Sequence, residues 1–167
     1  MNEEAPGRDF LDLPNSTSPA SGEVLSEPKP SRRVLVVEDD FITAEVIVTA
    51  LEARGCSVTA AFDGVQALNN PVWQVADLVV TDIDMPRMGG IYMMRTMRAR
   101  RPHLPVVIVT GHAERIALEA LRAEAPGPVL MLDKPVTGTQ VADLVDACLS
   151  GAAGIDASCL PPANTTG

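Results

Sequence analysis

Polar side chains that could do chemistry together stand at or just beyond the ends of four short apolar runs of the sequence. They are Glu38 and Asp39, Asp82, Thr110 and Lys134. Two carboxylates ~4 Å apart repel by about 4 kcal/mol at an effective dielectric near 20, so such a cluster raises a pKa or binds a divalent cation. Carboxylates suit Mg²⁺, and a hydroxyl with an ammonium suits phosphoryl oxygens. The set predicts a phosphoryl-transfer site with Asp82 as the acceptor nucleophile.

The apolar runs that precede these side chains predict buried strands. We expect strands at residues 34–37, 58–62, 77–82, 106–110 and 129–132. Most of them are continuously apolar, which is typical of parallel strands that are covered on both faces. Pro86 cannot continue a sheet ladder, so the third strand ends before it and leaves Asp82 at its C-terminal mouth. Open α/β sheets bind their ligands at this mouth.

Helical patterns alternate with the predicted strands. They cover residues 41–54, 65–69, 90–100, 114–125 and 139–149. This alternation predicts an α/β fold, a five-stranded parallel sheet with helices on both faces, of the doubly wound, flavodoxin-like (βα)5 type. Because the C-terminal ends of parallel strands share one edge, the polar residues of that edge are expected to converge. Asp40 is interpreted as the N-cap of the first helix and Met94 and Met97 as core residues.

The charge pattern bears on partners. The formal net charge is −9, from 13 basic and 22 acidic residues, so free nucleic acid would be repelled. The densest basic run, Arg95 to Arg101, alternates with Met, Thr and Ala in a predicted helix. We interpret it as a solvated helix face, and we expect no nucleic acid among the partners.

The composition predicts one globular domain with two tails. Residues 1–31, rich in Pro, Ser, Glu and Gly, are expected to be disordered, residues 32–150 to form the domain, and residues 151–167 to be a flexible tail. No apolar run approaches the roughly 20 residues that span a bilayer, and the N-terminus has no secretory signal pattern. Three scattered cysteines suggest reduced thiols. We therefore expect a cytoplasmic protein without membrane contact.

Five motifs between residues 33 and 149 resemble those of the receiver domain of two-component response regulators. In order they are VLVVEDD, AFDGVQAL, DLVVTDIDMPRMGG, PVVIVTGHA and LDKPV. The resemblance implies that Asp82 accepts a phosphoryl group from a phosphohistidine of a sensor histidine kinase or a histidine phosphotransfer protein. It also implies that Glu38, Asp39, Asp82 and the backbone carbonyl of Asp84 hold Mg²⁺.

The same resemblance implies a switch. Thr110 and Lys134 would contact the phosphoryl group, whose arrival draws the hydroxyl inward and shifts the surface formed by the fourth helix, fifth strand and fifth helix. That surface could also form a homodimer. Met131 stands where the family usually has an aromatic residue, and a flexible Met can fill and vacate the same gap. Asp84 and His112 either orient or repel the attacking water, and so set the lifetime of the acyl phosphate, or are exposed loop residues.

Three other functions compete with this interpretation. Asp82 and Asp84 also fit the nucleophile and acid/base pair of haloacid-dehalogenase-like phosphatases, although the acids that precede them and Met85-Pro86 after them do not. A flavodoxin-like FMN protein is disfavoured, because it would place an anionic phosphate beside the acids that follow the first strand. A receiver that acts without phosphorylation would not need the full set of site residues.

About 18 residues follow the last predicted helix, too few for an output domain. We therefore expect a stand-alone receiver rather than an enzyme. It would act through an unknown downstream protein, as a phosphorelay shuttle, a phosphate sink or a partner-binding switch.

Overall fold

A computed structural model describes residues 31–111, 115–124 and 126–151 of the chain. The predicted tails, 1–31 and 151–167, lie outside these ranges except for Ser31 and Gly151, and so does His112. Among the helices of the described ranges, none has both the length and the apolar character that a bilayer crossing requires.

The predicted elements are all present, with bounds that differ by at most two residues. The strands are β1 Arg33–Val37, β2 Ser57–Ala61, β3 Leu78–Thr81, β4 Val106–Thr110 and β5 Val129–Asp133. The helices are α1 Phe41–Glu52, α2 Gly64–Asn69, α3 Gly90–Arg100, α4 Arg115–Glu124 and α5 Gly138–Leu149. A 3₁₀ helix, η1 Pro71–Gln74, was not predicted, and it starts where the side chain of Asn70 accepts a hydrogen bond from the Val72 amide at 3.0 Å.

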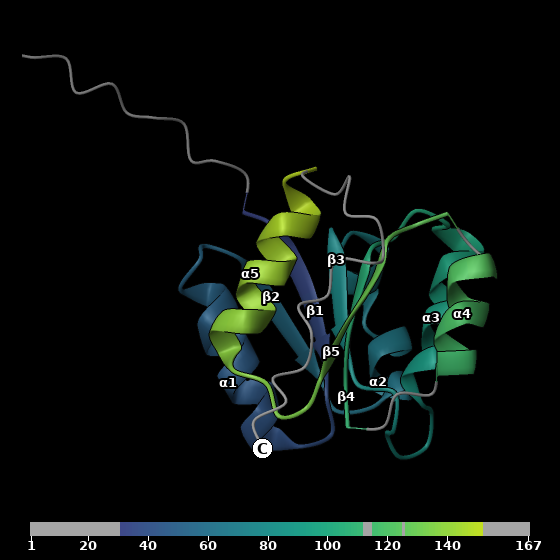
Figure 1. Ribbon diagram of the computed structural model, residues 1–167, viewed down its shortest axis with the longest axis horizontal. Coiled ribbons are helices and arrows are strands. Elements are labelled where there is room, and N and C mark those ends of the chain that lie inside the picture. Colours follow the sequence, from purple (N-terminus) through teal and green to yellow (C-terminus); the bar gives the residue numbers. More distant parts are fainter. Residues whose placement is uncertain (1–30, 112–114, 125, 152–167) are drawn as a thin grey trace, which may run out of the picture.

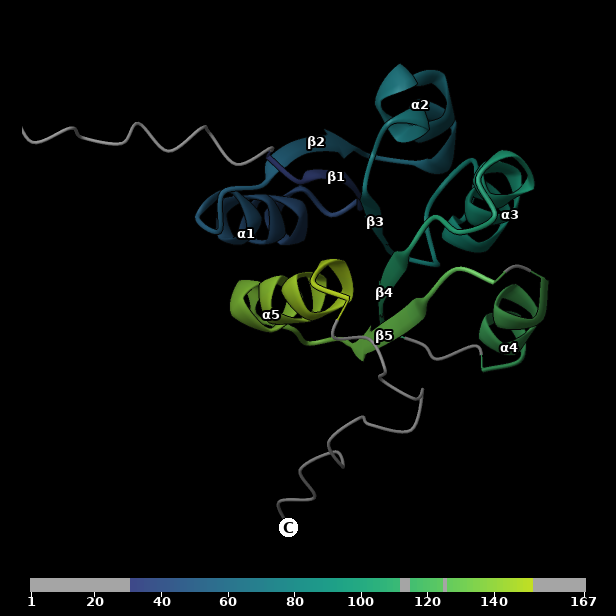
Figure 2. The ribbon, with the colours of Figure 1, turned by 90° about the horizontal axis from the view of Figure 1, so that it is seen from above.

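The strands form one parallel sheet in the order β2-β1-β3-β4-β5 (Figure 1). Seen from above, α1 and α5 cover one face of this sheet and α2, α3 and α4 cover the other (Figure 2). The predicted fold class is confirmed. Val37 is in register with Ala61 and Thr81, and Thr110 is in register with Asp133. The carboxyl ends of the strands are therefore nearly level at one edge.

Strand side chains point alternately to the two faces and fill two cores. The core under α2, α3 and α4 includes Leu35, Val79, Ile108 and Met131. The core under α1 and α5 includes Val36, Val80, Val109 and Val145. Met94 and Met97 are fully buried in the first core, as predicted. Because β1 and β3 are covered on both faces, the residues at their ends have fixed positions.

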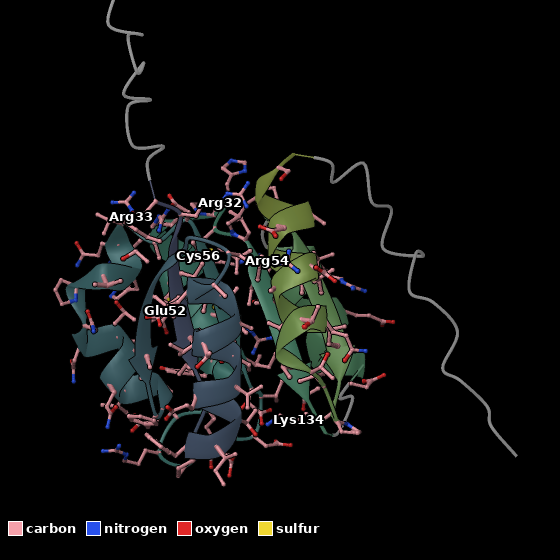
Figure 3. The ribbon with its side chains drawn as sticks, turned by 90° about the vertical axis from the view of Figure 1, so that its left-hand side faces the viewer. Arg32, Arg33, Glu52, Arg54, Cys56 and Lys134 are labelled. Atoms are coloured by element: carbon pink, nitrogen blue, oxygen red, sulfur yellow. The ribbon has the colours of Figure 1, made fainter. Side chains whose placement is uncertain are left out.

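Helices α1 and α5 are held against each other by close packing and by ion pairs. A Cβ at Gly138 would lie 2.7 Å from the Ala50 Cβ, so the first turn of α5 lies directly on α1. At the other end, Arg54 pairs with Asp143 at 2.6 Å and with Asp146 at 2.7 Å, where Figure 3 shows it beside α5. Exposed ion pairs contribute little each, so packing dominates this contact.

The arginines between residues 95 and 101 do not form one solvated face, and that interpretation was wrong for Arg98 and Arg101. Arg98 is only 3% exposed. Its guanidinium donates to the carbonyl of Leu104 at 2.8 and 3.1 Å and to that of Pro128 at 2.7 Å. Burial lowers the pKa of Arg98 to about 10, so the group remains charged at neutral pH. Arg98 thus ties together the segments that lead into β4 and β5.

Arg101 forms equivalent hydrogen bonds to the segment that leads into β3. Its guanidinium donates to the carbonyls of Trp73 at 2.9 Å and Ala76 at 2.7 Å. Arg95 and Arg100 are exposed, as predicted for the whole run. The side chains of this run therefore stabilise the amino edge of the sheet, opposite the edge where Asp82 lies.

Replacing Arg98 with Leu is expected to lower the free energy of unfolding by about 1–3 kcal/mol, because the carbonyl of the buried Leu104 loses its guanidinium donor and that of Pro128 keeps only the Val106 amide. Arg100→Leu, on the exposed face of the same helix, should change it by less than about 0.5 kcal/mol. Urea unfolding measures both. Equal stabilities for the two variants would show that Arg98 is not needed to satisfy these carbonyls.

Candidate functional site

The predicted site residues gather at the carboxyl edge of the sheet. Glu38 and Asp39 follow β1, Asp82 follows β3, Thr110 ends β4 and Lys134 follows β5. Backbone hydrogen bonds extend the pairing of the strands to these positions. The Asp82 amide donates to the Val37 carbonyl at 3.0 Å, and the Lys134 amide donates to the Thr110 carbonyl at 2.8 Å. Figure 3 shows Lys134 at the end of the domain opposite to the arginine that opens β1.

Lys134 joins the two buried carboxylates. Its Nζ donates to Asp82 Oδ2 at 2.6 Å and to Glu38 Oε1 at 2.9 Å. Burial alone lowers the pKa of Lys134, but its hydrogen bonds to Asp82 and Glu38 outweigh this and raise the pKa. The group is therefore an ammonium, and the two carboxylates are its partner anions.

Asp82 is held by the backbone that follows it. Its Oδ1 accepts hydrogen bonds from the amides of Ile83 at 2.5 Å and Asp84 at 3.3 Å, while Oδ2 faces Lys134. Helix α3 begins against the same residue, because a Cβ at Gly90 would lie 2.0 Å from the Asp82 carbonyl oxygen. The carboxylate is thus oriented on both oxygens in a buried position.

The acidic side chains form a group that fits a divalent cation. Glu38, Asp39 and Asp82 each offer an oxygen, and these atoms lie within 4.8 Å of one another. Glu38 Oε2 is buried and has no hydrogen-bond partner in the described part of the chain. Burial raises the pKa of Glu38, and the hydrogen bond from Lys134 offsets part of that rise.

The charges of this group are not balanced by the lysine. Three carboxylates and one ammonium leave a formal charge of −3 + 1 = −2 when all are ionised. Hard divalent cations such as Mg²⁺ prefer oxygen ligands of this kind. The orphaned oxygen of Glu38 and the charge excess both fit such an ion, held by Glu38, Asp39 and Asp82.

Asp40 lies next to the group of acids but is the N-cap of α1. Its Oδ1 accepts a hydrogen bond from the Thr43 amide at 2.7 Å, and this bond lowers the pKa of Asp40. The residue is exposed and lies outside the group of three acids. The predicted N-cap of α1 is confirmed.

The remaining residues that were predicted to belong to the site differ in burial and position. Thr110 is fully buried at the end of β4, and Met131 is buried on β5 in the core under α2, α3 and α4. Asp84 is exposed, with its amide bonded to Asp82. His112 lies outside the described residues.

Two residues near the site had no assigned role in the sequence. Asp63 is fully buried and forms an ion pair with Arg87 in the loop after Asp82. An Asp directly before a helical pattern is a recognisable N-cap signal, and Asp63 does accept from the Gln66 amide at 2.9 Å. Nothing in the sequence indicated its pairing with Arg87.

The family model for the response regulator receiver domain matches residues 34–147. The chain belongs to the response regulator receiver domain family. Among curated relatives of this receiver, the DNA-binding transcriptional regulator NtrC of Klebsiella pneumoniae is 32% identical over 115 residues, covering 69% of this chain and 24% of NtrC. The transcriptional regulatory protein ZraR of Escherichia coli is 33% identical over 125 residues, covering 74% and 28%. The receiver thus spans about a quarter of the length of these relatives.

Solved structures agree with the family. A CheY-like receiver domain protein of Methanospirillum hungatei JF-1 is 25% identical, with a TM-score of 0.62 over 72% of this chain and 94% of that one. The receiver domain of the Francisella response regulator 1452 is 28% identical, with a TM-score of 0.62 over 72% and 98%. Receiver domains are phosphoacceptor signalling domains that bind Mg²⁺ at an acidic pocket and interact with histidine kinases. Membership favours this function over the phosphatase and FMN-binding alternatives.

Mg²⁺ is expected to stabilise the folded receiver, because an ion that binds only the folded state adds about 1 kcal/mol at five times its dissociation constant. Asp39→Asn should reduce this gain, since one of the three acids loses its charge. Asp40→Asn is the matched control: it removes the same charge one residue away, and Asn also caps helices. Thermal unfolding with and without Mg²⁺ measures the gain. A gain in Asp39→Asn equal to that of wild type would contradict the assignment.

Proposed function

We propose that this receiver accepts a phosphoryl group on Asp82 from a phosphohistidine of a sensor histidine kinase or histidine phosphotransfer protein. The observation that carries the proposal is the Lys134 ammonium, within hydrogen-bond distance of both Asp82 and Glu38 at the edge where the acids meet. An acceptor carboxylate, a group of acids suited to Mg²⁺ and a mobile positive charge are the parts that phosphoryl transfer requires.

In the proposed reaction an oxygen of Asp82 attacks phosphorus. The new P–O bond makes an acyl phosphate, and the P–N bond of the phosphohistidine breaks, leaving its electron pair on the imidazole nitrogen. The Lys134 ammonium, which the carboxylates hold at the site, neutralises charge on the phosphoryl oxygens, and the Thr110 hydroxyl donates a hydrogen bond to them. Mg²⁺, when bound by Glu38, Asp39 and Asp82, supplies further positive charge there. The Asp84 carbonyl is proposed as another ligand.

The receiver is proposed to act as a signalling protein whose own chemistry is limited to this transfer and slow loss of its phosphoryl group. Asp84 and His112 are proposed to set that loss by orienting or repelling water. Burial of Asp82 and its three donors leaves water little access to the acyl carbon. A cytoplasmic location suits a phosphodonor that is charged from ATP.

The output is proposed to be a change in protein contacts, as in a shuttle, a sink or a partner-binding switch. The net charge of −9 opposes a direct contact with nucleic acid. Thr110 and Lys134 stand on either side of the β4–β5 pairing, so their response to the phosphoryl group would reach α4, β5 and α5. Met131, in that pairing, is proposed to fill or vacate space beside Thr110. The same surface is the proposed face for a homodimer.

Exposed apolar side chains next to the acids support docking of the phosphodonor on α1. Ile42 is 74% exposed, and Phe41 and Phe62 stack with ring centroids 6.0 Å apart at the solvent boundary. Helix α1 starts one residue after Asp40, so this face adjoins the acidic group. Exposed apolar side chains of this kind mark protein–protein contact surfaces.

Asp82→Asn is expected to abolish phosphotransfer from a panel of sensor kinases, because a neutral amide cannot form the acyl phosphate. Radiolabelled phosphate on the receiver measures the transfer, and its release by hydroxylamine identifies an acyl phosphate. Asp40→Asn should be labelled as well as wild type. Labelling of Asp82→Asn at the wild-type level would disprove the assignment of the acceptor.

Ile42→Asp is expected to slow transfer from a phosphorylated kinase about tenfold, the effect of roughly 1.4 kcal/mol lost from docking. Transfer from acetyl phosphate, which needs no docking face, should be unchanged. Val75→Asp is the matched control, since Val75 is 48% exposed next to η1 at the opposite edge of the sheet. The measurement is the rate of phosphotransfer from the kinase and from acetyl phosphate for each variant. Equal slowing with both donors would mean that Ile42 affects the site and not the docking.

A further inference from the structure

The loop that follows the phosphoacceptor is tied to α2 by a buried charge. Asp63 is 0% exposed, and Arg87, in the loop of residues 83–89, is 60% exposed. One oxygen of Asp63 caps α2 through the Gln66 amide, and the other forms an ion pair with the Arg87 guanidinium. Oδ2 of Asp63 is buried and accepts no hydrogen bond from the described residues, so the ion pair with Arg87 is the contact that offsets the cost of burying this charge.

The backbone of Arg87 is held in a conformation that it does not favour. Its φ of 64° is positive, and no other non-glycine residue in the described ranges has a positive φ. The Met88 amide donates to the Pro86 carbonyl at 2.7 Å, which closes a tight three-residue turn with Arg87 at its centre. Such a turn is rare and strained, at a cost of order 1–3 kcal/mol. A contact outside the turn must therefore stabilise it.

The loop also packs on α2 with no spare room. The Gly64 amide donates to the Met88 carbonyl at 3.2 Å, and a Cβ at Gly64 would lie 2.7 Å from that oxygen and 2.8 Å from Met88 Cγ. The ion pair and this contact act on adjacent residues of the loop. Together they fix the turn against the first residues of α2.

The same loop orients Asp82 at its start, and at its end it is bonded back to its own first residue. At its start, the amides of Ile83 and Asp84 donate to Asp82 Oδ1. At its end, the Gly90 amide donates to the Ile83 carbonyl at 3.0 Å. A shift of the Arg87 turn therefore moves the amides that orient the acceptor carboxylate, and with them the residue proposed to offer a carbonyl to Mg²⁺.

We propose that Asp63 and Arg87 are positioning residues that hold this strained turn and so preorganise Asp82 and Asp84 for the cation and the phosphoryl group. This rests on the proposed function of the site. The ion pair touches neither ligand, and it acts through the loop. Partners of this kind, one shell beyond the ligands, typically contribute 10- to 100-fold to metal affinity.

Substitutions at Arg87 separate this role from a simple charge effect. Removing a positive charge near a cation site should tighten Mg²⁺ binding electrostatically. Loss of the turn should instead weaken it. Arg87→Ala removes the ion pair and keeps the strain, whereas Arg87→Gly removes both, because glycine adopts a positive φ freely.

We expect Arg87→Ala to bind Mg²⁺ about tenfold more weakly in calorimetric titration of the full chain and to show faster hydrogen exchange of the Ile83 and Asp84 amides. Arg87→Gly should lie between Ala and wild type. Arg95→Ala is the matched control, because Arg95 is an exposed arginine ion-paired with Glu124 on α3. It should bind Mg²⁺ as wild type does.

A second pair of variants keeps the test valid if one of them unfolds. Asp63→Asn retains a capping side chain and loses the charge, and the double variant Asp63→Asn/Arg87→Ala should lose no more affinity than either single one. Additive losses, wild-type affinity in Arg87→Ala, or an Arg87→Gly loss as large as that of Ala would each overturn the proposal. Phosphorylation by acetyl phosphate is measured in parallel. If wild type takes no phosphoryl group the proposed function fails, while Mg²⁺ affinity still decides the role of the ion pair.

Discussion

The structure depends on two buried carboxylates, Glu38 and Asp82, that are brought close together although they repel. Adjacent parallel strands β1 and β3 end level with each other, so their register holds the acids that follow them close together. Two such charges about 4 Å apart repel by roughly 4 kcal/mol at an effective dielectric of 20. Lys134 contacts both and offsets this repulsion. A positive charge between these oxygens therefore stabilises the site when both carboxylates are ionised.

That requirement links binding to signalling. An ammonium and a divalent cation are attracted to the same oxygens, and one buried oxygen of Glu38 receives no hydrogen bond from the described residues. A phosphoryl group on Asp82 would convert the carboxylate into an ester-like acyl group and place new negative charge further out. The Lys134 ammonium would then move toward the negative charge of the phosphoryl oxygens. The strand order that creates the repulsion would thus also make the position of Lys134 sensitive to the proposed phosphorylation.

Much of this could be predicted from the sequence because the signals are local. Apolar runs predicted the strands, and polar residues at or just beyond the ends of these runs lie at the shared edge, which is why Glu38, Asp82 and Lys134 could be predicted to lie together. Arg98 was misassigned because its partners are backbone carbonyls, and carbonyls leave no pattern in a sequence.

The pairing of Asp63 with Arg87 could not be predicted for a related reason. It joins residues from two loops and depends on a positive φ at an arginine, which sequence rules do not anticipate. The roles of Asp84 and Met131 stay predictions, as does that of His112. In each case the structure gives a position at most, whereas the role concerns water or a moving side chain.

The contacts around Asp82 differ between its two sides. On the α2 and α3 side, Gly90 lies against the Asp82 carbonyl and Gly64 lies against Met88. These close contacts leave no space into which the loop of residues 83–89 could move. On the other side, Lys134 contacts Asp82 only through its flexible side chain. Packed interfaces resist small displacements, whereas a lysine changes rotamer readily. A new charge at Asp82 would therefore be accommodated on the β4–β5 side, and the direction of the proposed switch would follow from the positions of Gly64 and Gly90.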